Sequence, residues 1–270
     1  MARKVMPKRY EILVIGCGGT GSAFLQNIVP YIIHRSPESP AVRLILCDGD
    51  IVEEKNLARQ VFFPDQIGMN KALALQESID STFELKAQVV DHYLETVSMI
   101  DAVFENRYMC MPVLVSCVDN LKARSIFEEW FNQTKDAVYI DCANEEYHGE
   151  VVYSTRFGGE LLSPTRSTVF PLFRAQLKAE AGSLRFRSEM DCLSRAMMGG
   201  AQHIFTNKMA GLLAASTVSR MLETNTPPSG VDLFRLRPST IVQHEETSSM
   251  LALLNAPKAK NACSKHKKAG

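Results

Sequence analysis

Short apolar runs alternate with amphipathic stretches along the first 157 residues of the chain. Such alternation is typical of βαβ units and a mostly parallel sheet. Because the strands are apolar at nearly every position, we expect helices to cover the sheet on both faces. The prediction is an α/β, Rossmann-like fold with flanking helices. The predicted strands are 11–15, 42–48, 86–94, 113–119, 137–143 and 150–155, and the predicted helices are 20–34, 70–80 and 121–134.

The pattern changes after Phe157. Residues 158–200 mix Gly, Pro, Ser and Arg with little periodicity, which predicts a long crossover loop. A helix over 201–222 follows, and its small residues favour close packing; two short apolar runs after it predict an antiparallel hairpin. We therefore divide the chain into a main α/β domain (1–157), the crossover loop (158–200), a helix and hairpin that complete the same domain (201–245), and a basic tail expected to be disordered (246–270).

Composition and charge narrow the classes of function. The 270 residues carry 30 basic and 30 acidic side chains, so the formal net charge is zero. This balance argues against nucleic acid as a bulk electrostatic partner. No stretch approaches the roughly 20 apolar residues that cross a bilayer, and the basic start has no long apolar run after it. We expect a cytoplasmic protein without a membrane segment.

The seven cysteines are an odd number and are widely scattered, and no two of them form a CxxC pair. A zinc site built from two such pairs is therefore excluded by spacing. Most of the cysteines lie in apolar runs, where a small buried side chain is the ordinary interpretation. Cys192 differs because polar residues flank it on both sides.

A glycine-rich turn follows the first predicted strand. Gly16, Gly18 and Gly21 fit the GxGxxG pattern between a strand and a helix, and Gly19 and Ser22 belong to the same turn, "GCGGTGS". Glycines at this place let backbone amides approach a phosphate group at the start of the helix. The turn alone serves NAD and ATP equally well.

Residues after the second predicted strand distinguish the two nucleotides. Asp48 ends that strand, where a carboxylate can accept hydrogen bonds from a ribose, and Asp50 follows it. Arg59 and Lys71 then add two cationic donors, which suit a polyphosphate longer than the single pyrophosphate of NAD. Asn56 and Gln60 accompany them as further candidate ligands of the nucleotide.

Asp119 and Asn120 end the fourth predicted strand. Open α/β sheets bind ligands at the carboxyl ends of their strands. A carboxylate there that faces a polyphosphate is a natural ligand of Mg²⁺, which prefers one or two carboxylates together with phosphate oxygens. Either residue could also cap the helix that follows, and both roles stay open.

Five ordered motifs of the chain resemble the ThiF/MoeB/HesA superfamily, the fold of ubiquitin-activating enzymes: "GCGGTGS" at 16–22, Asp48, "NLARQ" at 56–60, Lys71 and "CVDN" at 117–120. The resemblance implies binding of ATP and Mg²⁺ and attack of a carboxylate on the α-phosphate. The attacking group in the family is usually the C-terminal carboxylate of a ubiquitin-like or sulfur-carrier protein. By the same resemblance, Asp48 holds the ribose, Asn56, Arg59 and Lys71 hold phosphates, and Asp119 binds Mg²⁺.

Many members of this superfamily pass the activated acyl group to a cysteine beyond the nucleotide domain. "MDCLSRAMMGGAQHIFTNKMA" is similar to the segment of bacterial ThiF-type proteins in which a cysteine precedes a helix with a Gln and an Asn. The match places Cys192, Gln202 and Asn207 at those positions, and the outline of the chain resembles the ThiF-family protein of PRTRC cassettes, which also encode a ubiquitin-like protein. A purely structural role for Cys192 stays open, and Cys142, at the end of the fifth strand, is the alternative acceptor.

Two departures from the superfamily bear on the assembly. MoeB-like members carry two CxxC pairs for zinc, so no structural zinc is expected in this chain. Members are usually homodimers, and many lend an arginine from an N-terminal helix to the partner's site. We expect a homodimer, but the short segment before Gly16 offers only Arg3 or Arg9 for that role. The competing hypotheses are an NAD-dependent oxidoreductase and a non-catalytic ATP-binding adaptor.

Overall fold

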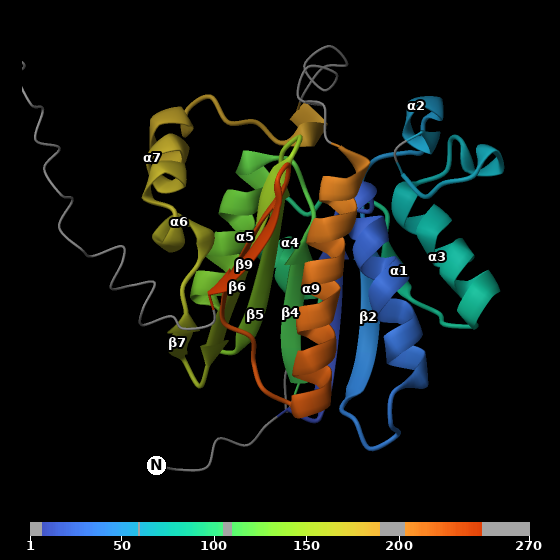
Figure 1. Cartoon of the computed structure of the whole chain (residues 1–270), viewed down its shortest axis with the longest axis horizontal. Coiled ribbons are helices and arrows are strands. Elements are labelled where there is room, and N and C mark those ends of the chain that lie inside the picture. Colours follow the sequence, from blue (N-terminus) through green and yellow to red (C-terminus); the bar gives the residue numbers. More distant parts are fainter. Residues whose placement is uncertain (1–6, 59, 105–109, 190–202, 245–270) are drawn as a thin grey trace, which may run out of the picture.

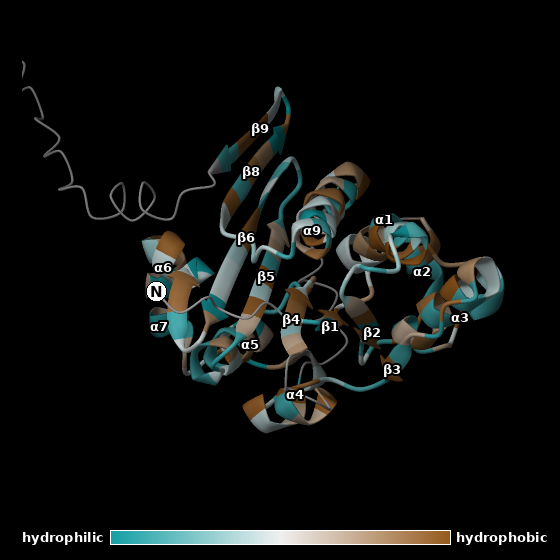
Figure 2. Cartoon of the chain, turned by 90° about the horizontal axis from the view of Figure 1, so that it is seen from below, coloured by the Kyte–Doolittle hydropathy of each residue, from teal (hydrophilic) through white to brown (hydrophobic). Residues whose placement is uncertain are grey.

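A nine-stranded sheet with helices on both faces forms the body of the protein (Figures 1 and 2). The computed structural model describes residues 7–58, 60–104, 110–189 and 203–244. The strands are β1 (Arg9–Ile15), β2 (Ala41–Cys47), β3 (Gln88–Val90), β4 (Cys110–Ser116), β5 (Ala137–Asn144), β6 (His148–Phe157), β7 (Glu160–Ser163), β8 (Gly230–Leu236) and β9 (Ser239–His244). The helices are α1 (Gly19–His34), α2 (Glu54–Leu57), α3 (Lys71–Phe83), α4 (Val97–Val103), α5 (Leu121–Gln133), α6 (Arg166–Val169), α7 (Pro171–Glu180) and α9 (Ile204–Thr224), with 3₁₀ turns η1 (Pro64–Gln66) and η2 (Arg187–Glu189).

The strand order is β3-β2-β1-β4-β5-β6-β8-β9, with β7 paired to β6. The first five strands of this order are parallel, and β6 to β9 extend the sheet with antiparallel pairs. The chain winds outward from β1 through β2 to β3 and then returns to β4 on the other side of β1, so the order reverses there. Ile15 is in register with Cys47 of β2 and Ser116 of β4, so the loops after these three strands leave the same edge. Ligands bind at such a switch point in open α/β sheets.

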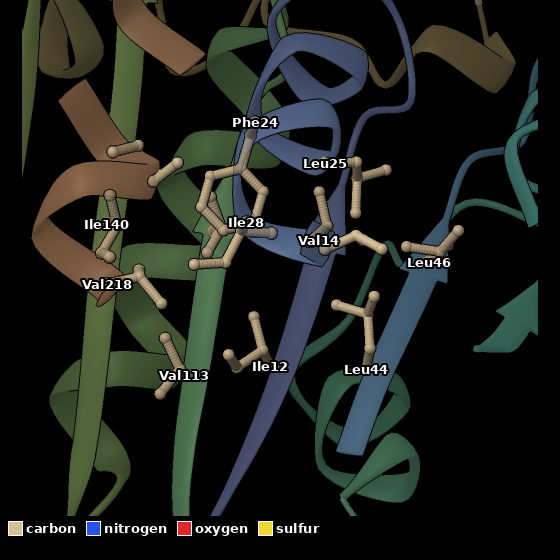
Figure 3. Close-up of a cluster of buried hydrophobic side chains, with 14 of the residues drawn as sticks. Ile12, Val14, Phe24, Leu25, Ile28, Leu44, Leu46, Val113, Ile140 and Val218 are labelled. Carbon is tan, nitrogen blue, oxygen red and sulfur yellow. The ribbon is translucent and has the colours of Figure 1, made fainter. Parts of the chain in front are cut away.

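Each central strand is buried on both faces, as its continuous apolar sequence predicts. In β1, Ile12 and Val14 pack in the core under α1, α3 and α9, whereas Leu13 and Ile15 pack in a second core with α4 and α5. Figure 3 shows the first of these cores, where Phe24 of α1 and the neighbouring side chains meet the sheet. The predicted α/β class, flanking helices and C-terminal antiparallel strands are thus confirmed.

Helices α1 and α9 lie side by side and pack almost backbone to backbone (Figure 1). A Cβ atom on Gly211 of α9 would lie 2.6 Å from the backbone nitrogen of Phe24 and 2.8 Å from the carbonyl oxygen of Thr20. Real Cβ atoms do not approach other atoms so closely, so a glycine is required at this contact. The small residues that the sequence shows in this helix therefore bring α9 against the first turns of α1.

The segment 158–200 corrects the expectation of a long loop, because its described part, 158–189, contains β7, α6, α7 and η2. Hydrophobic periodicity misses α6 because the helix is held by a buried cation, Arg166, which is 3% exposed. Helix α7 begins at Pro171, a residue favoured in the first helical turn, and buries none of its side chains. From α7 the chain passes along the carboxyl edge of the parallel strands toward α9 (Figure 1).

Two further differences from the predicted elements lie between β2 and β4. The strand expected over 86–94 is only three residues long, because the chain leaves the sheet after Val90. Helix α4 is absent from the predicted elements; it is a short helix that begins after Thr96, whose hydroxyl oxygen accepts the Met99 amide. Within the described ranges, no helix is both long and apolar enough to cross a membrane.

Candidate active site

A cavity of about 640 Å³ opens at the carboxyl ends of β1, β2, β4 and β5. Its volume lies within the range of about 300–1,000 Å³ that is common for small-molecule sites. Of the predicted residues, Gly16, Gly18, Gly19, Asp48, Asp50, Gln60, Lys71, Asp119 and Asn120 line this cavity. Gly21, Ser22 and Asn56 are not among its described lining residues, and Arg59 and Cys192 lie outside the described residues.

The glycine turn joins β1 to α1 in a conformation that side chains would block. Gly16 has a φ of 94°, and a Cβ atom on it would lie 2.7 Å from the carbonyl oxygen of Cys117. A Cβ atom on Gly21 would overlap the carbonyl oxygen of Gly16. Gly18 is the N-cap of α1 and carries no capping side chain. The first amide groups of the helix, which lack intrahelical acceptors, therefore lie beside the cavity.

Thr20, not the predicted Ser22, is the hydroxyl residue of the turn that lines the cavity. The Ser22 hydroxyl donates to the carbonyl oxygen of Gly19 at 3.1 Å and stays inside the helix. Thr20 lines the cavity, and its hydroxyl lies 3.2 Å from the side-chain oxygens of both Asn144 and Asn207. The Asn144 amide also donates to Asn207 at 2.6 Å. Asn207, which the resemblance singled out, thus braces the first turn of α1 from α9.

Asp48 closes the turn from the end of β2. One carboxylate oxygen accepts the backbone amide of Cys17 at 2.7 Å, and the other accepts the backbone amide of Asp50 at 2.8 Å. Burial raises the pKa of Asp48, an effect that the charge of Lys71 and both backbone hydrogen bonds oppose. Both oxygens therefore hold the backbone of the cavity wall in place, in addition to any contact with a ligand.

Asp50 and Lys71 form the charged pair of the cavity. The Lys71 ammonium lies 3.2 Å from one Asp50 oxygen, and its side chain is 8% exposed. The Tyr93 hydroxyl donates to the other Asp50 oxygen. Asn70, the N-cap of α3, donates to the carbonyl oxygen of Asp48 at 2.7 Å and so fixes the loop that carries Asp50. An Asn immediately before a predicted helix is a capping signal that could have identified this residue.

Asn56 and Gln60 lie on the loop between β2 and α3. Asn56 is 4% exposed, and its side-chain oxygen accepts the backbone amide of Glu53, so it caps the short helix α2. Gln60 instead lines the cavity and lies against Gly18. Its side-chain oxygen is buried and has no hydrogen-bond partner among the described residues. Gln60 therefore offers an acceptor at the cavity that a ligand or a water molecule can use.

Asn120, not Asp119, caps the helix that follows β4. The Asn120 side-chain oxygen accepts the Ala123 amide at 2.9 Å, and its side-chain nitrogen donates to the carbonyl oxygen of Arg185 at 3.0 Å. Asp119 is exposed and lines the cavity. The two roles that the sequence left open thus fall to different residues, and Asp119 presents a carboxylate on the cavity side.

A buried ion network supports this wall of the cavity. Arg124 lines the cavity and donates to a carboxylate oxygen of Asp141 and to the carbonyl oxygens of Val118 and Cys142. Arg166 donates to the other Asp141 oxygen at 2.5 Å. Burial lowers the pKa of Arg166, but the Asp141 and Glu150 carboxylates outweigh that effect and leave it raised. Sequence reasoning missed this network because its members are far apart in the chain.

The alternative acceptor Cys142 is buried and is absent from the described lining of the cavity. Its thiol shares a hydrogen bond with Cys117, which does line the cavity. This hydrogen bond, together with burial, raises the pKa of the Cys117 thiol. The Cys117 thiol therefore favours the protonated form, which is a poor nucleophile. No group of three or more His, Cys, Asp or Glu side chains gathers as a metal site in the part of the chain that the structure describes.

Comparison with known proteins identifies the family. The family model described as "ThiF family" matches residues 7–260. The chain belongs to the ThiF family. Among relatives of this ThiF-family chain, ubiquitin-like modifier-activating enzyme 5 of Oryza sativa subsp. japonica is 28% identical over 133 residues, and that of Arabidopsis thaliana is 27% identical over 146 residues. These matches cover 46% and 47% of this chain but only 30% and 31% of the relatives' own lengths.

Solved structures support the fold of this ThiF-family chain. PaaA superposes with a TM-score of 0.60 at 15% identity, covering 88% of this chain and 73% of PaaA. Escherichia coli MccB, crystallised with ATP, superposes with a TM-score of 0.56 at 18% identity, covering 87% of this chain and 63% of MccB. At such identities the likeness establishes the fold alone.

Proposed function

We propose that this ThiF-family chain is an adenylyltransferase that uses ATP to activate the C-terminal carboxylate of a ubiquitin-like or sulfur-carrier protein. The observation that carries the proposal is that one cavity joins the N-terminus of α1, Lys71 and Asp119. The first follows β1, Lys71 begins α3, and Asp119 follows β4. Together they offer amide donors, a cation and a carboxylate, which suit a triphosphate and its metal ion.

The phosphate groups would lie between the first turn of α1 and Lys71. The glycine turn leaves the helix amides open to the cavity, and the helix dipole favours an anion there. The Lys71 ammonium has three donors, so it can bind a phosphate oxygen and still contact Asp50. Arg59, three residues after Asn56 in the sequence, remains a proposed second cation.

The ribose would bind next to these groups, at the loop after β2. Each Asp48 oxygen accepts one backbone amide and can accept a further donor, so we assign the ribose hydroxyl groups to Asp48 together with Asp50, its neighbour on the same wall. Tyr93, which donates to Asp50, would hold this carboxylate in place. Asp48 would thereby combine the expected ribose contact with support of the turn that carries Asp50.

Asp119 is the proposed protein ligand of Mg²⁺. Its carboxylate lies on the cavity wall, and the helix cap that would otherwise occupy it comes from Asn120. One carboxylate fits a Mg²⁺ ion, which takes its remaining ligands from phosphate oxygens and water. When bound, the ion would neutralise charge on the phosphates.

The reaction needs positioning and charge neutralisation more than proton transfer. The substrate carboxylate is ionised at neutral pH, so no general base is required. One of its oxygens would attack the α-phosphorus, and the bond from that phosphorus to the bridging oxygen would break. The products are an acyl-adenylate and pyrophosphate, which leaves with the electron pair of the broken bond. A further part of the proposal is attack of the Cys192 thiolate on the acyl carbon, which forms a thioester while the carbon–oxygen bond to the phosphate breaks and AMP leaves.

The carrier-protein substrate is supported by the relatives, which are named as ubiquitin-like modifier-activating enzymes. MccB has been crystallised with MccA and the nucleotide AMPCPP. The similarity of this chain to the ThiF-family protein of PRTRC cassettes makes the ubiquitin-like protein of such a cassette the first candidate. We further propose a cytoplasmic homodimer.

Pyrophosphate exchange tests the proposal. Radiolabelled pyrophosphate should enter ATP only when the chain, Mg²⁺ and a carrier protein with a free C-terminal glycine are all present. A carrier that lacks this glycine is the control. Tighter binding of NADH than of ATP would instead favour the oxidoreductase. If the chain binds ATP but catalyses no pyrophosphate exchange with any of the carrier proteins encoded beside its gene, the non-catalytic adaptor is favoured.

A further inference from the structure

A short strap, residues 184–188, crosses the mouth of the cavity from far along the chain. Three contacts hold it to the start of α5 and to the loop after β3. The Asn120 side chain donates to the carbonyl oxygen of Arg185 at 3.0 Å, and the Lys122 ammonium lies 5.5 Å from the centre of the Phe186 ring. The Ser188 hydroxyl donates to the carboxylate of Glu95, in the loop after β3. The strap is therefore attached to both sides of the cavity mouth.

Phe186 is the side chain that this strap contributes to the cavity wall. Among the described lining residues, it alone comes from beyond Glu146. Its ring is partly buried, although no helix or strand of the body carries it. A large aromatic side chain held over a cavity by polar tethers is suited to contact a ligand inside that cavity.

The cavity has two chemically different ends. The end under α1 and α9 is formed by Gly18, Gly19 and Thr20, with the open amides of the helix. The cavity then crosses the edge of the sheet to the side of α4 and α5. There its walls include the apolar side chains of Leu94 and Phe127, which belong to the core under α4 and α5, with Glu95 and Arg124 beside them. Phe186 lies at this second end, beside Lys122 of α5.

The difference between the two ends of the cavity favours one orientation of a bound nucleoside triphosphate. Its phosphates require the amide-rich end, and its ribose requires the carboxylate of Asp50 between the two ends. The base, which has two apolar faces, is then left for the apolar end. Resting on the proposed function, we propose that Phe186 stacks on the adenine base of ATP and that this contact makes the strap part of the nucleotide site.

Direct binding of ATP to the full chain tests this role without any measurement of activity. Base-aromatic stacking is worth about 1–3 kcal/mol, so Phe186→Leu should weaken binding of Mg·ATP about 5- to 150-fold in calorimetry. Phe186→Tyr keeps the ring and should bind ATP as the unmodified chain does. Phe205→Leu is the matched control, because Phe205 is 59% exposed on α9 and is not among the described lining residues.

Inorganic tripolyphosphate separates stacking from a loss of cavity shape. It lacks the base, so its affinity should be the same for Phe186→Leu and for the unmodified chain. Equal losses for tripolyphosphate and ATP would overturn the proposal and leave Phe186 as a structural anchor. An unchanged ATP affinity would also overturn it. If the unmodified chain binds no ATP, the proposed function fails instead, so the two failures are distinguishable.

Fluorescence provides a second readout that does not depend on weakened binding. The chain has one tryptophan, Trp130, which is fully buried in the core. Phe186→Trp places a second indole at the strap, and ATP should quench its emission by stacking. The unmodified chain corrects for Trp130. Absence of quenching at saturating ATP, with binding verified by calorimetry, would overturn the stacking contact.

Discussion

Asn207 of α9 lies directly against Gly19 in the first turn of α1, where a Cβ atom on Gly19 would overlap its side-chain amide. Asn207 also accepts hydrogen bonds from Thr20 and Asn144. The C-terminal helix therefore shapes the turn that begins the candidate phosphate site. This relationship explains why a glycine stands at position 19, which the GxGxxG pattern does not require.

Asn207→Ala should lower the free energy of unfolding by about 1–3 kcal/mol, because it removes the side-chain oxygen that accepts hydrogen bonds from Thr20 and Asn144. The turn should also loosen, so ATP affinity should fall. Urea denaturation and calorimetry measure the two effects. Lys208→Ala, an exposed position on the same helix, is the control and should leave both values unchanged. Equal stability of the two variants would contradict the bracing role of Asn207.

Asp119→Ala should reduce activity without loss of stability, whereas Asn120→Ala should reduce stability. Asp119→Ala should abolish pyrophosphate exchange and Mg²⁺-dependent ATP binding while the melting temperature stays the same, since Asp119 does not cap α5. Asn120→Ala removes the cap and should cost about 0.5–2 kcal/mol of stability. Activity assays over a Mg²⁺ titration and thermal denaturation distinguish them. Full exchange activity in Asp119→Ala would remove the metal assignment.

Asp141→Ala should be the most destabilising of these changes. It leaves Arg124 and Arg166, which are 7% and 3% exposed, without their shared carboxylate. Breaking a buried ion pair by removal of one partner costs about 3–5 kcal/mol. Glu150→Gln is a milder control because the Glu150 side chain is 26% exposed. Urea denaturation should rank the two variants in this order, and similar losses for both would count against the network.

The buried Asp48 carboxyl should make the free energy of unfolding depend on pH. Because burial raises its pKa in the folded state, the folded chain holds this proton more tightly than the unfolded chain does. The resulting stabilisation is full below the unfolded pKa of about 3.9 and is lost as the pH rises through the folded value. Relative to Asp48→Asn, the unmodified chain should therefore gain stability as the pH falls from neutral. Urea denaturation across that range checks the sign, and a constant difference would contradict it.

Cys192→Ala should spare adenylation and remove any thioester between the carrier and the chain. Non-reducing gels with and without thiol detect this bond. Cys142→Ala should keep the thioester, because that thiol is buried and absent from the described cavity lining. Cys263→Ala, in the basic tail, controls for loss of any cysteine. A thioester that survives Cys192→Ala but not Cys142→Ala would reverse the assignment.

Sequence patterns predicted the fold because its signals are local. Apolar runs, helical spacing and the glycine turn each act over a few residues, and they determine the order of strands and helices. They also placed Lys71 and Asp119 at strand or helix ends, which a parallel sheet brings to one edge. Local patterns could not reveal α6, since a buried Arg166 holds it in place of an apolar face.

The sequence alone was enough to predict the α/β class, the glycine turn after β1 and many of the residues that line the cavity. The choice between neighbouring residues came from the tertiary structure, which brings Thr20 rather than Ser22 to the cavity and Asn120 rather than Asp119 to the helix cap. It also brought Asn207 and Phe186 to the cavity region. The physical reason is that these choices depend on side-chain direction and on contacts between distant segments, which chain folding creates and no local pattern encodes.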